Sequence, residues 1–373
     1  MRELGIGLIG TGFMGKAHAF AYRAAKAAYP DIPTPRLRMV ADMNADAAAK
    51  AADQYGFGKS SGDWKALIAD PAVDVVSITT PNTLHKEMAL AAIAAGKHVH
   101  CEKPLSPSLT DSAEMVKAAK AKGVTTQVGF NYIKNPLLKL AREMVAAGEL
   151  GEITNFRGIH AEDYMHDPEA PYTWRIDPVG GPGVIADLGS HIIGVARFLL
   201  GPITDVNADV ETVVKSRPSS RGSTEHTPVR VDDIARLLVR FERGCGGTIE
   251  ANWMATGRKM QLGFELSGTK GGLVFSQENL NELHYYKAGG DPRHMGFTKL
   301  EAGPQHFPYG QFCVAGGHQL GFNDLKTIEM AEFLAAIAGG PRLGPDFAEA
   351  YEIQKVVEVA IESSKQNKRL RVP

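Results

Sequence analysis

The stretch Ile6-Gly7-Leu8-Ile9-Gly10-Thr11-Gly12-Phe13-Met14-Gly15 decides how the first part of this 373-residue chain folds. The apolar run 6–9 predicts a buried strand, and the Ala-rich run 17–28, which lacks Pro and Gly, predicts a helix. Between them lies the pattern Gly-x-Gly-x-x-Gly. An ordinary strand-to-helix turn can contain it by chance, but between a strand and a helix it indicates dinucleotide binding. Gly10 allows the tight turn, Gly12 lets the backbone approach a pyrophosphate, and Gly15 lets helix and strand pack closely.

Composition narrows the class of protein. A hydrophobic content of 44% with 22% charged residues is that of a globular protein with sizeable cores, and 373 residues favour two domains. The formal net charge of -1 gives no attraction to nucleic acid or to an acidic membrane surface. No apolar run approaches the roughly 18 residues of a membrane span. The three distant cysteines form neither a disulfide framework nor a metal cluster, so we expect a cytoplasmic protein.

The first third alternates between strand-like and helix-like segments. Strands are predicted at 37–41, 73–78, 98–101 and 124–128, and helices at 45–55, 85–95 and 110–123. Repeated strand–helix units predict an α/β domain, residues 1–128, with a doubly wound parallel sheet of the Rossmann type.

The pattern changes in the rest of the chain. Strands are predicted at 153–161, 203–214, 231–242, 247–255, 261–266 and 282–287, with helices at 324–338 and 346–365. Successive strands with few helices between them predict an α+β domain, residues 129–373, built on a large, mostly antiparallel open sheet. The Ser-, Arg- and Pro-rich segment 216–228 reads as a mobile connection between two of its strands.

Asp42 directly follows the second predicted strand. A carboxylate in this position accepts hydrogen bonds from the ribose hydroxyls of the adenosine and repels a 2′-phosphate. It lies 27 residues after Gly15, and the Pro-rich insertion 30–36 explains this long spacing. No Arg follows directly, so NAD is favoured over NADP. Asp42 could also cap the next helix, a role compatible with ribose binding.

Two further clusters contain residues capable of acid–base chemistry. Glu102-Lys103-Pro104 ends a strand at the carboxyl side of the sheet, so Lys103 should lie near the nicotinamide end of a cofactor, although it could equally be a surface lysine. Asp187 and His191 lie four residues apart on a predicted helix, 183–200. The carboxylate can orient the imidazole as a general base, or the pair can be merely structural. Two ligands are too few for a metal site.

With these motifs the chain resembles the glucose–fructose oxidoreductase / inositol dehydrogenase / rhizopine-catabolism (Gfo/Idh/MocA) family over nearly its whole length. The likeness rests on Gly10–Gly15, Thr80-Pro-Asn-Thr-Leu-His85, Glu102-Lys-Pro104 and Asp187-Leu-Gly-Ser-His191, in the family's order and spacing. It implies that Lys103, Asp187 and His191 are the catalytic set. It also implies a homo-oligomer, a dimer or tetramer, formed through the second sheet. The expected cofactor contacts are Gly10, Gly12, Phe13, Met14, Gly15, Asp42, Thr80, Asn82, His85, Glu102, Lys103, Asn131, Trp174 and Arg175.

Trp174-Arg175 is similar to a pair that borders cofactor and substrate in the family's sugar and polyol dehydrogenases. Two departures from the family pattern affect the identity of the substrate: residues 131–134 lack an Arg, and Pro182 interrupts the glycine run before the helix. The substrate-facing candidates are aromatic or hydrogen-bonding groups suited to a sugar ring, namely Tyr132, Tyr164, His166, Trp174, Arg175 and His318.

The leading hypothesis is an NAD-dependent dehydrogenase that oxidises a secondary ring hydroxyl of a cyclic polyol or pyranose to a ketone or lactone. Inositols, aldoses and anhydrosugars all fit. A glycosidase that uses transient oxidation by bound NAD is an alternative on the same scaffold. A non-catalytic dinucleotide sensor is a third hypothesis, which the joint presence of Lys103, Asp187 and His191 disfavours.

Overall fold

The computed structural model describes residues 2–177 and 179–373, and these form two compact units. The first unit extends to Lys134 and includes Gly321–Tyr351; the second comprises Asn135–Leu320 and Glu352–Pro373. The sequence placed one boundary between residues 128 and 129, whereas the chain returns to the first unit late. It returns because helix α8 (Phe322–Ile337) buries its apolar residues in the core of the first unit.

The first unit contains a six-stranded parallel sheet of order β3-β2-β1-β4-β5-β6. Its strands are β1 (Glu3–Ile9), β2 (Thr34–Ala41), β3 (Lys59–Ser61), β4 (Val75–Ile78), β5 (His98–Cys101) and β6 (Thr126–Val128). The predicted doubly wound α/β fold is therefore confirmed, with β3 and the short helix α3 (Trp64–Ala69) as additions. Strand order reverses between β1 and β4, and ligands bind at the carboxyl ends of the strands beside such a reversal.

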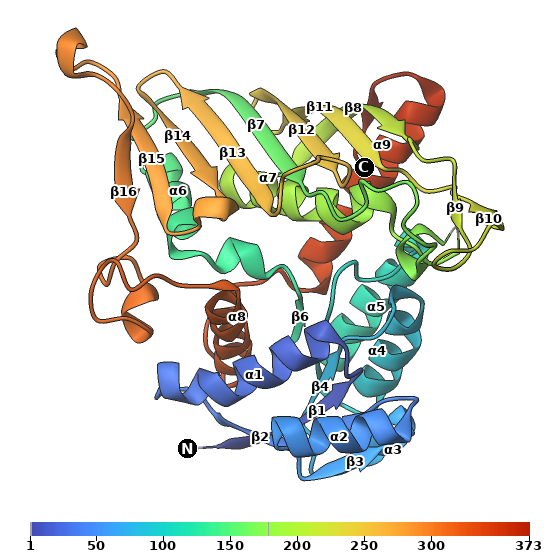
Figure 1. Cartoon of the computed structure of the whole chain (residues 1–373). Coiled ribbons are helices and arrows are strands. Elements are labelled where there is room, and N and C mark those ends of the chain that lie inside the picture. Colours follow the sequence, from blue (N-terminus) through green and yellow to red (C-terminus); the bar gives the residue numbers. More distant parts are fainter. Residues whose placement is uncertain (1, 178) are drawn as a thin grey trace. The chain divides into compact units, whose positions relative to one another are not determined.

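Helices cover both faces of this sheet (Figure 1). Besides α3 and α8 they are α1 (Phe13–Ala28), α2 (Ala45–Tyr55), α4 (His85–Ala94) and α5 (Leu109–Lys122). Leu4 and Ile6 of β1 pack with α1 and α8 in one buried cluster. Gly7 points the opposite way, and a Cβ there would lie 2.5 Å from the side chain of Leu67 on α3. The strand is thus buried on both sides, as its continuous apolar run predicts.

The second unit contains a nine-stranded sheet of order β16-β15-β14-β13-β7-β12-β11-β8-β17. The strands are β7 (Ile153–Ala161), β8 (Ile203–Glu211), β11 (Ile234–Phe241), β12 (Gly246–Asn252), β13 (Gln261–Gly268), β14 (Gly271–Ser276), β15 (Glu282–Lys287), β16 (Thr298–Glu301) and β17 (Leu370–Arg371). Neighbours are antiparallel except β7 and β12, which confirms the predicted mostly antiparallel sheet.

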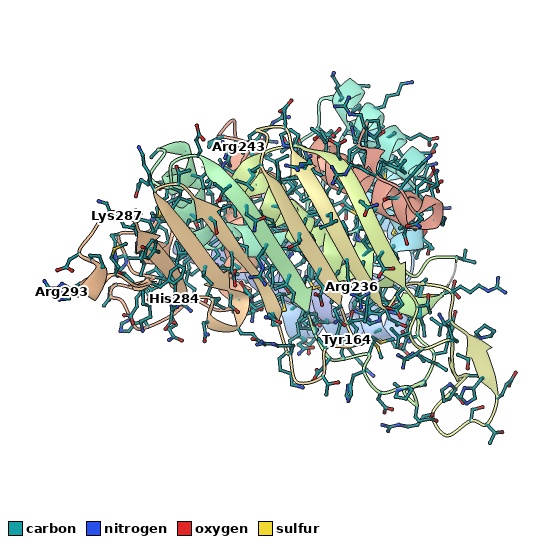
Figure 2. All side chains as sticks on the ribbon, turned by 90° about the horizontal axis from the view of Figure 1, so that it is seen from above. Tyr164, Arg236, Arg243, His284, Lys287 and Arg293 are labelled. Carbon is teal, nitrogen blue, oxygen red and sulfur yellow. The ribbon has the colours of Figure 1, made fainter. Side chains whose placement is uncertain are left out.

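One face of the nine-stranded sheet is packed and the other is open. Helix α7 (Ser190–Leu200) lies against the packed face, so closely that a Cβ on Gly158 of β7 would lie 2.7 Å from Ile192. Helices α6 (Pro136–Ala146) and the later part of α9 (Phe347–Gln366) complete this unit. The open face carries the exposed side chains of β11, among them Arg236, and faces the viewer in Figure 2.

The segment 216–228 is a β-hairpin and not the mobile connection expected from its composition. Strands β9 (Ser216–Pro218) and β10 (His226–Pro228) pair antiparallel. Composition misled here because the feature that anchors the hairpin is one buried side chain, Arg217, with none of its surface exposed.

Candidate functional site

The glycine loop of the first unit has the geometry of a phosphate-binding turn. Gly10 has a φ of 99°, a conformation that L side chains rarely adopt, and a Cβ on Gly15 would lie 2.2 Å from the carbonyl oxygen of Gly10. A Cβ on Gly12, by contrast, would meet no described atom within 4 Å. Helix α1 starts at Phe13 without a side-chain cap, so its first N–H groups are available to an anion. Met14 lies in the same turn.

Asp42 lies where β2 ends and is tied to the glycine loop. Its Oδ2 accepts hydrogen bonds from the backbone N–H of Thr11 (3.0 Å) and from the Thr11 hydroxyl (2.7 Å). Its Oδ1 accepts from the N–H of Asn44 (3.0 Å), which itself caps α2. Asp42 therefore fixes the loop in addition to presenting a carboxylate at the expected ribose position.

The loop after β4 carries Thr80, Asn82 and His85. His85 is fully buried, with Nε2 2.9 Å from the carbonyl oxygen of Thr80 and Nδ1 3.0 Å from that of Pro104. Burial lowers the pKa of His85, and its hydrogen bonds to the two carbonyl groups offset part of this effect. His85 thus joins the loops after β4 and β5. This arrangement favours a positioning role over the expected direct contact with a cofactor.

Two buried amide groups lack a hydrogen-bond partner among the described residues. The Nδ2 atoms of Asn82 and Asn131 are buried and have no hydrogen-bond partner among the described residues. Buried donors are nearly always paired, so unpaired ones require an explanation such as a bound group. Both residues were expected to contact the cofactor.

Glu102 and Lys103 follow β5, and their side chains differ in burial. Lys103 is half-buried, whereas Glu102 is buried, with Oε1 2.8 Å from Nε2 of His18 and 2.9 Å from Nζ of Lys326. A Cβ on Gly129 would lie 2.4 Å from Glu102, so only glycine leaves room for this carboxylate. The bonds of Glu102 to interior groups favour support of the Lys103 loop over the expected cofactor contact.

Glu102 belongs to a buried polar network that sequence reasoning missed. Lys326 also pairs with Glu329 (3.2 Å), which bonds to His100, and His18 lies 2.8 Å from Ser77. Burial would raise the pKa of Glu102, but Lys326 and His18 hold it well below its usual range. Burial lowers the pKa of His18 to about 4, so this ring is neutral near pH 7. The only sequence signal was the spacing of Lys326 and Glu329, oppositely charged residues three positions apart on the predicted helix 324–338.

Aromatic residues gather at the start of α1 and α8 in the first unit. The ring of Phe13, 73% exposed, lies 5.8 Å from that of Phe322, and Tyr132 lies 6.2 Å from Phe322. Phe322 was not predicted as a site residue. Tyr132 was a substrate candidate, and the structure shows its ring as part of this aromatic group.

The second unit presents Asp187 and His191. The chain is helical from 183 to 200, as predicted, but Ile185–Gly189 forms a π-helical turn that leads directly into α7. Such turns are frequent at functional sites. Asp232 holds the start of this helix, since its Oδ2 accepts from the N–H of Ile185 (2.7 Å). Burial raises the pKa of Asp232 to about 6.

Asp187 receives two partners from the segment that follows β7. The hydroxyl of Tyr164 donates to its Oδ2 (3.0 Å), and Nε of Arg175 lies 3.4 Å from the same atom. The Arg175 guanidinium also stacks on Trp174, 4.7 Å from the ring centre. Burial and the Asp187 charge raise the pKa of Tyr164, which therefore remains a donor. Tyr164, Trp174 and Arg175 are thus brought together at Asp187.

His191 packs beside a second buried histidine. The rings of His160 and His191 lie 5.5 Å apart, edge to face. Nδ1 of His160 is 2.9 Å from the carbonyl oxygen of Leu188, and Nε2 is 3.1 Å from Glu162. Neither His160 nor Glu162 was predicted; both lie at the carboxyl end of β7, where the alternation of side chains gave the only signal.

The remaining two candidates lie apart from these contacts. His166 is exposed, and its Nδ1 lies 2.6 Å from the carbonyl oxygen of Asp163. His318 is exposed on a loop where Gly317 and Gln319 both have positive φ. Within the described parts of the chain, no group of three or more His, Cys, Asp or Glu side chains could hold a metal ion. None of the helices in those parts is both long and apolar enough to cross a bilayer.

Comparison with protein families identifies both parts of the chain. Residues 4–130 match the oxidoreductase family with an NAD-binding Rossmann fold, and residues 138–274 match the GFO/IDH/MocA C-terminal domain. The chain belongs to the GFO/IDH/MocA oxidoreductase family. The resemblance stated from the motifs is therefore confirmed, and with it the expectation of an NAD-type oxidoreductase.

Three relatives of this GFO/IDH/MocA oxidoreductase are informative. Levoglucosan dehydrogenase of Pseudarthrobacter phenanthrenivorans is 37% identical, covering 100% of this chain and 99% of the relative. A solved structure of levoglucosan dehydrogenase in complex with NADH and levoglucosan superposes with a TM-score of 0.95 at 37% identity, with all of both chains covered. An NAD-binding oxidoreductase from Klebsiella pneumoniae is 42% identical with a TM-score of 0.95, covering 100% of this chain and 99% of the other.

Proposed function

We propose that this oxidoreductase oxidises a secondary ring hydroxyl of a pyranose-type sugar or anhydrosugar, with NAD as the hydride acceptor. The observation that carries the proposal is the arrangement of Tyr164, Arg175 and Trp174 around Asp187, beside His191. Full-length similarity to levoglucosan dehydrogenase supports the same class of substrate. Tyr164 and Trp174 are 40% and 45% exposed, and such amphipathic rings suit the apolar face of a sugar.

The residues of the first unit fit a dinucleotide. The uncapped start of α1 and the open space at Gly12 would take the pyrophosphate, and the free amides of Asn82 and Asn131 would bind polar groups of the cofactor. Asp42 would accept the ribose hydroxyls, which supports NAD over NADP because a 2′-phosphate would meet a carboxylate. When bound, the nicotinamide supplies the hydride acceptor.

The protein's own residues would handle the proton and the charge. His191 would remove the proton of the reacting hydroxyl as a general base. Asp187, held by Tyr164 and Arg175, would orient this imidazole or a neighbouring hydroxyl. Lys103 would stabilise the negative charge that develops on the oxygen. The support for assigning Lys103 to the same reaction is family membership and its motif.

A substrate screen tests this proposal. Purified protein is mixed with NAD and with levoglucosan, other anhydrosugars, aldoses or inositols, and NADH formation is followed by absorbance. We expect turnover with at least one pyranose or anhydrosugar, and a loss of at least ~100-fold in Lys103→Met and in His191→Ala. His294→Ala, at an 81% exposed side chain, is the matched control and should keep full activity. Near-normal rates in both site variants would contradict the assignment.

The same substrate screen distinguishes the dehydrogenase from the two alternative functions. Release of aryl alcohol from an aryl glycoside, without net NADH, would indicate the glycosidase. NADH binding without turnover of any sugar would indicate a dinucleotide sensor. Parallel wells with NADP test the role of Asp42, since equal rates with both cofactors would contradict it.

We also propose that the open face of the nine-stranded sheet joins copies of this chain into a homo-oligomer. Leu238 on β11 is 50% exposed there. Around it, charged residues of neighbouring strands pair with one another, Arg157 with Glu265 (2.9 Å) and Arg236 with Asp209 (2.9 Å). A broad face whose charges are already neutralised, with apolar groups between them, is suited to association.

A further inference from the structure

Two adjacent residues of strand β9 hold both ends of the segment 163–176, which carries Tyr164, Trp174 and Arg175. At the first end, Arg217 donates from Nη2 to the carbonyl oxygen of Met165 (2.7 Å) and from Nη1 to that of Asp167 (2.6 Å). At the other end, the carbonyl oxygen of Pro218 accepts from the N–H of Tyr172 (2.8 Å). Tyr164 lies just beyond the carboxyl end of β7 (Figure 2).

A buried arginine such as Arg217 is rarely present only to fill space. Its side chain is fully buried, and its two Nη atoms donate hydrogen bonds to neutral carbonyl oxygens. The carboxylates of Asp233 and Asp167 favour its charge at longer range. Burying a cation without a directly bonded counter-ion is costly, and an apolar residue of similar volume is often the more stable alternative. The guanidinium does what an apolar group cannot, because its rigid fork bonds two backbone carbonyls at once.

A second connection reaches Tyr164 from the base of the same hairpin. Asp233 is fully buried and accepts from the backbone N–H groups of Val213 (2.7 Å) and Val214 (2.9 Å), just before β9. Its other oxygen accepts from Nε1 of Trp253 (2.7 Å). The ring of Trp253 lies 6.0 Å from that of Tyr164, edge to face. Both the backbone after Tyr164 and its ring are therefore held by groups anchored to the hairpin.

We infer that Arg217 is a positioning residue for sugar binding, which acts through the carbonyl groups of Met165 and Asp167 to hold Tyr164 and Arg175 at Asp187. The β9–β10 hairpin is then a specificity element, because it sets the path of the segment that presents these side chains. This inference rests on the proposed function, in which that segment faces the sugar. It assigns no contact between Arg217 and the substrate.

Steady-state kinetics of Arg217→Ala, Arg217→Lys and Arg221→Ala test the inference. Arg221 is the matched control, an exposed arginine in the turn of the same hairpin. Loss of two charge-assisted hydrogen bonds should raise the KM for the sugar about tenfold or more in Arg217→Ala, with the KM for NAD unchanged. Added guanidinium at low, non-denaturing concentration should restore part of the loss in Arg217→Ala and have no such effect on Arg221→Ala.

A double-mutant cycle with Tyr164→Phe locates the effect. If Arg217 acts through Tyr164, the double variant should be little worse than the poorer single variant. Additive losses, or a KM for the sugar in both Arg217 variants equal to that of Arg221→Ala, would overturn the inference. If Arg217→Ala does not fold, Arg217→Lys carries the test, because it keeps the buried charge but cannot span both carbonyls in the same way.

Hydrogen exchange distinguishes failure of this inference from failure of the proposed function. Amides of residues 163–176 should exchange faster in the Arg217 variants than in wild type and Arg221→Ala, whether or not any sugar is oxidised. Faster exchange in a protein without sugar turnover would support the positioning role of Arg217 and refute the proposed function. Unchanged exchange in an active enzyme would refute only the positioning role of Arg217.

Discussion

At the scale of single residues, Asp42 has one role that the structure shows, holding the glycine loop, and one that we propose, binding the ribose. The motif spacing predicts a carboxylate for the ribose, and the structure adds that the same carboxylate anchors the glycine loop through Thr11. Asp42→Ala removes both roles. We therefore expect the KM for NAD to rise about tenfold or more, and the preference for NAD over NADP to fall.

Thr11→Val is the matched variant for this prediction, because it removes only the hydroxyl bond to Asp42 and keeps the backbone bond. It should raise the KM for NAD less than Asp42→Ala does. The measurement is initial rate against NAD and NADP concentration at saturating sugar. An unchanged KM for NAD in Asp42→Ala would contradict the assignment.

Residue motifs are enough to propose reactive groups but do not reveal all of their partners. Lys103, Asp187 and His191 stand in short patterns whose order resembles the family's, so the sequence alone could propose them. Glu162, His160 and Lys326 come close to site residues only through the folded chain, and no spacing in the sequence records that approach. Tyr164 was expected to face a sugar, and its bond to Asp187 depends on a loop path that is set by Arg217.

At the scale of elements, α8 shows why the expected domain boundary differs from the observed units. An apolar helical stripe predicts that a helix is buried, but it does not say against which core. Met330 and Phe333 of α8 pack with residues of α1 and β1, and Lys326 reaches Glu102 after β5. Long-range contacts of this kind decide the unit to which the helix belongs.

Lys326→Met tests how strongly this helix depends on its buried ion pairs. The variant leaves the buried carboxylates of Glu102 and Glu329 without their cation, which typically costs about 3–5 kcal/mol. We expect urea unfolding to show a loss of this order. Lys299→Met, which breaks exposed pairs with Glu282 and Glu301, should have little effect on stability because these pairs are screened by water. Equal losses in the two variants would show that the buried network is not a special source of stability.

At the scale of the whole molecule, His18 makes a contribution to stability that should be lost in mild acid. Its folded-state pKa of about 4 lies below the ordinary value of 6.5, so the unfolded chain binds more protons between these values. The contribution of this ring is complete above pH 6.5 and is lost as the pH falls toward 4, by an amount of about 3 kcal/mol. Glu102, whose pKa is also lowered, acts in the same direction at lower pH. Asp232, whose pKa is raised from 3.8 to about 6, acts in the opposite direction over nearly the same pH range as His18 and offsets most of the loss due to His18.

Thermal unfolding between pH 4.5 and 7.5 measures this dependence. The stability of His18→Gln relative to wild type should rise as the pH falls from 6.5 toward 4.5, because the loss due to His18 is gone while the opposing effect of Asp232 remains. The exposed His226→Gln should follow the wild-type curve. Parallel curves for wild type and His18→Gln would contradict the assignment to this ring.

We predict that whole molecules associate through the open face of the nine-stranded sheet, on which Leu238 of β11 is exposed. Leu238→Glu places a charge at the centre of that face, where burial against a second copy would strip it of water at high cost. If the sheet forms the interface, sedimentation velocity should show wild type as a dimer or tetramer and Leu238→Glu at least tenfold more dissociated. Leu343→Glu, at a leucine equally exposed (50%) in the first unit, should associate like wild type. If the oligomer persists in Leu238→Glu but dissociates in Leu343→Glu, the interface does not lie on the nine-stranded sheet. A monomeric wild type would refute the prediction of a homo-oligomer.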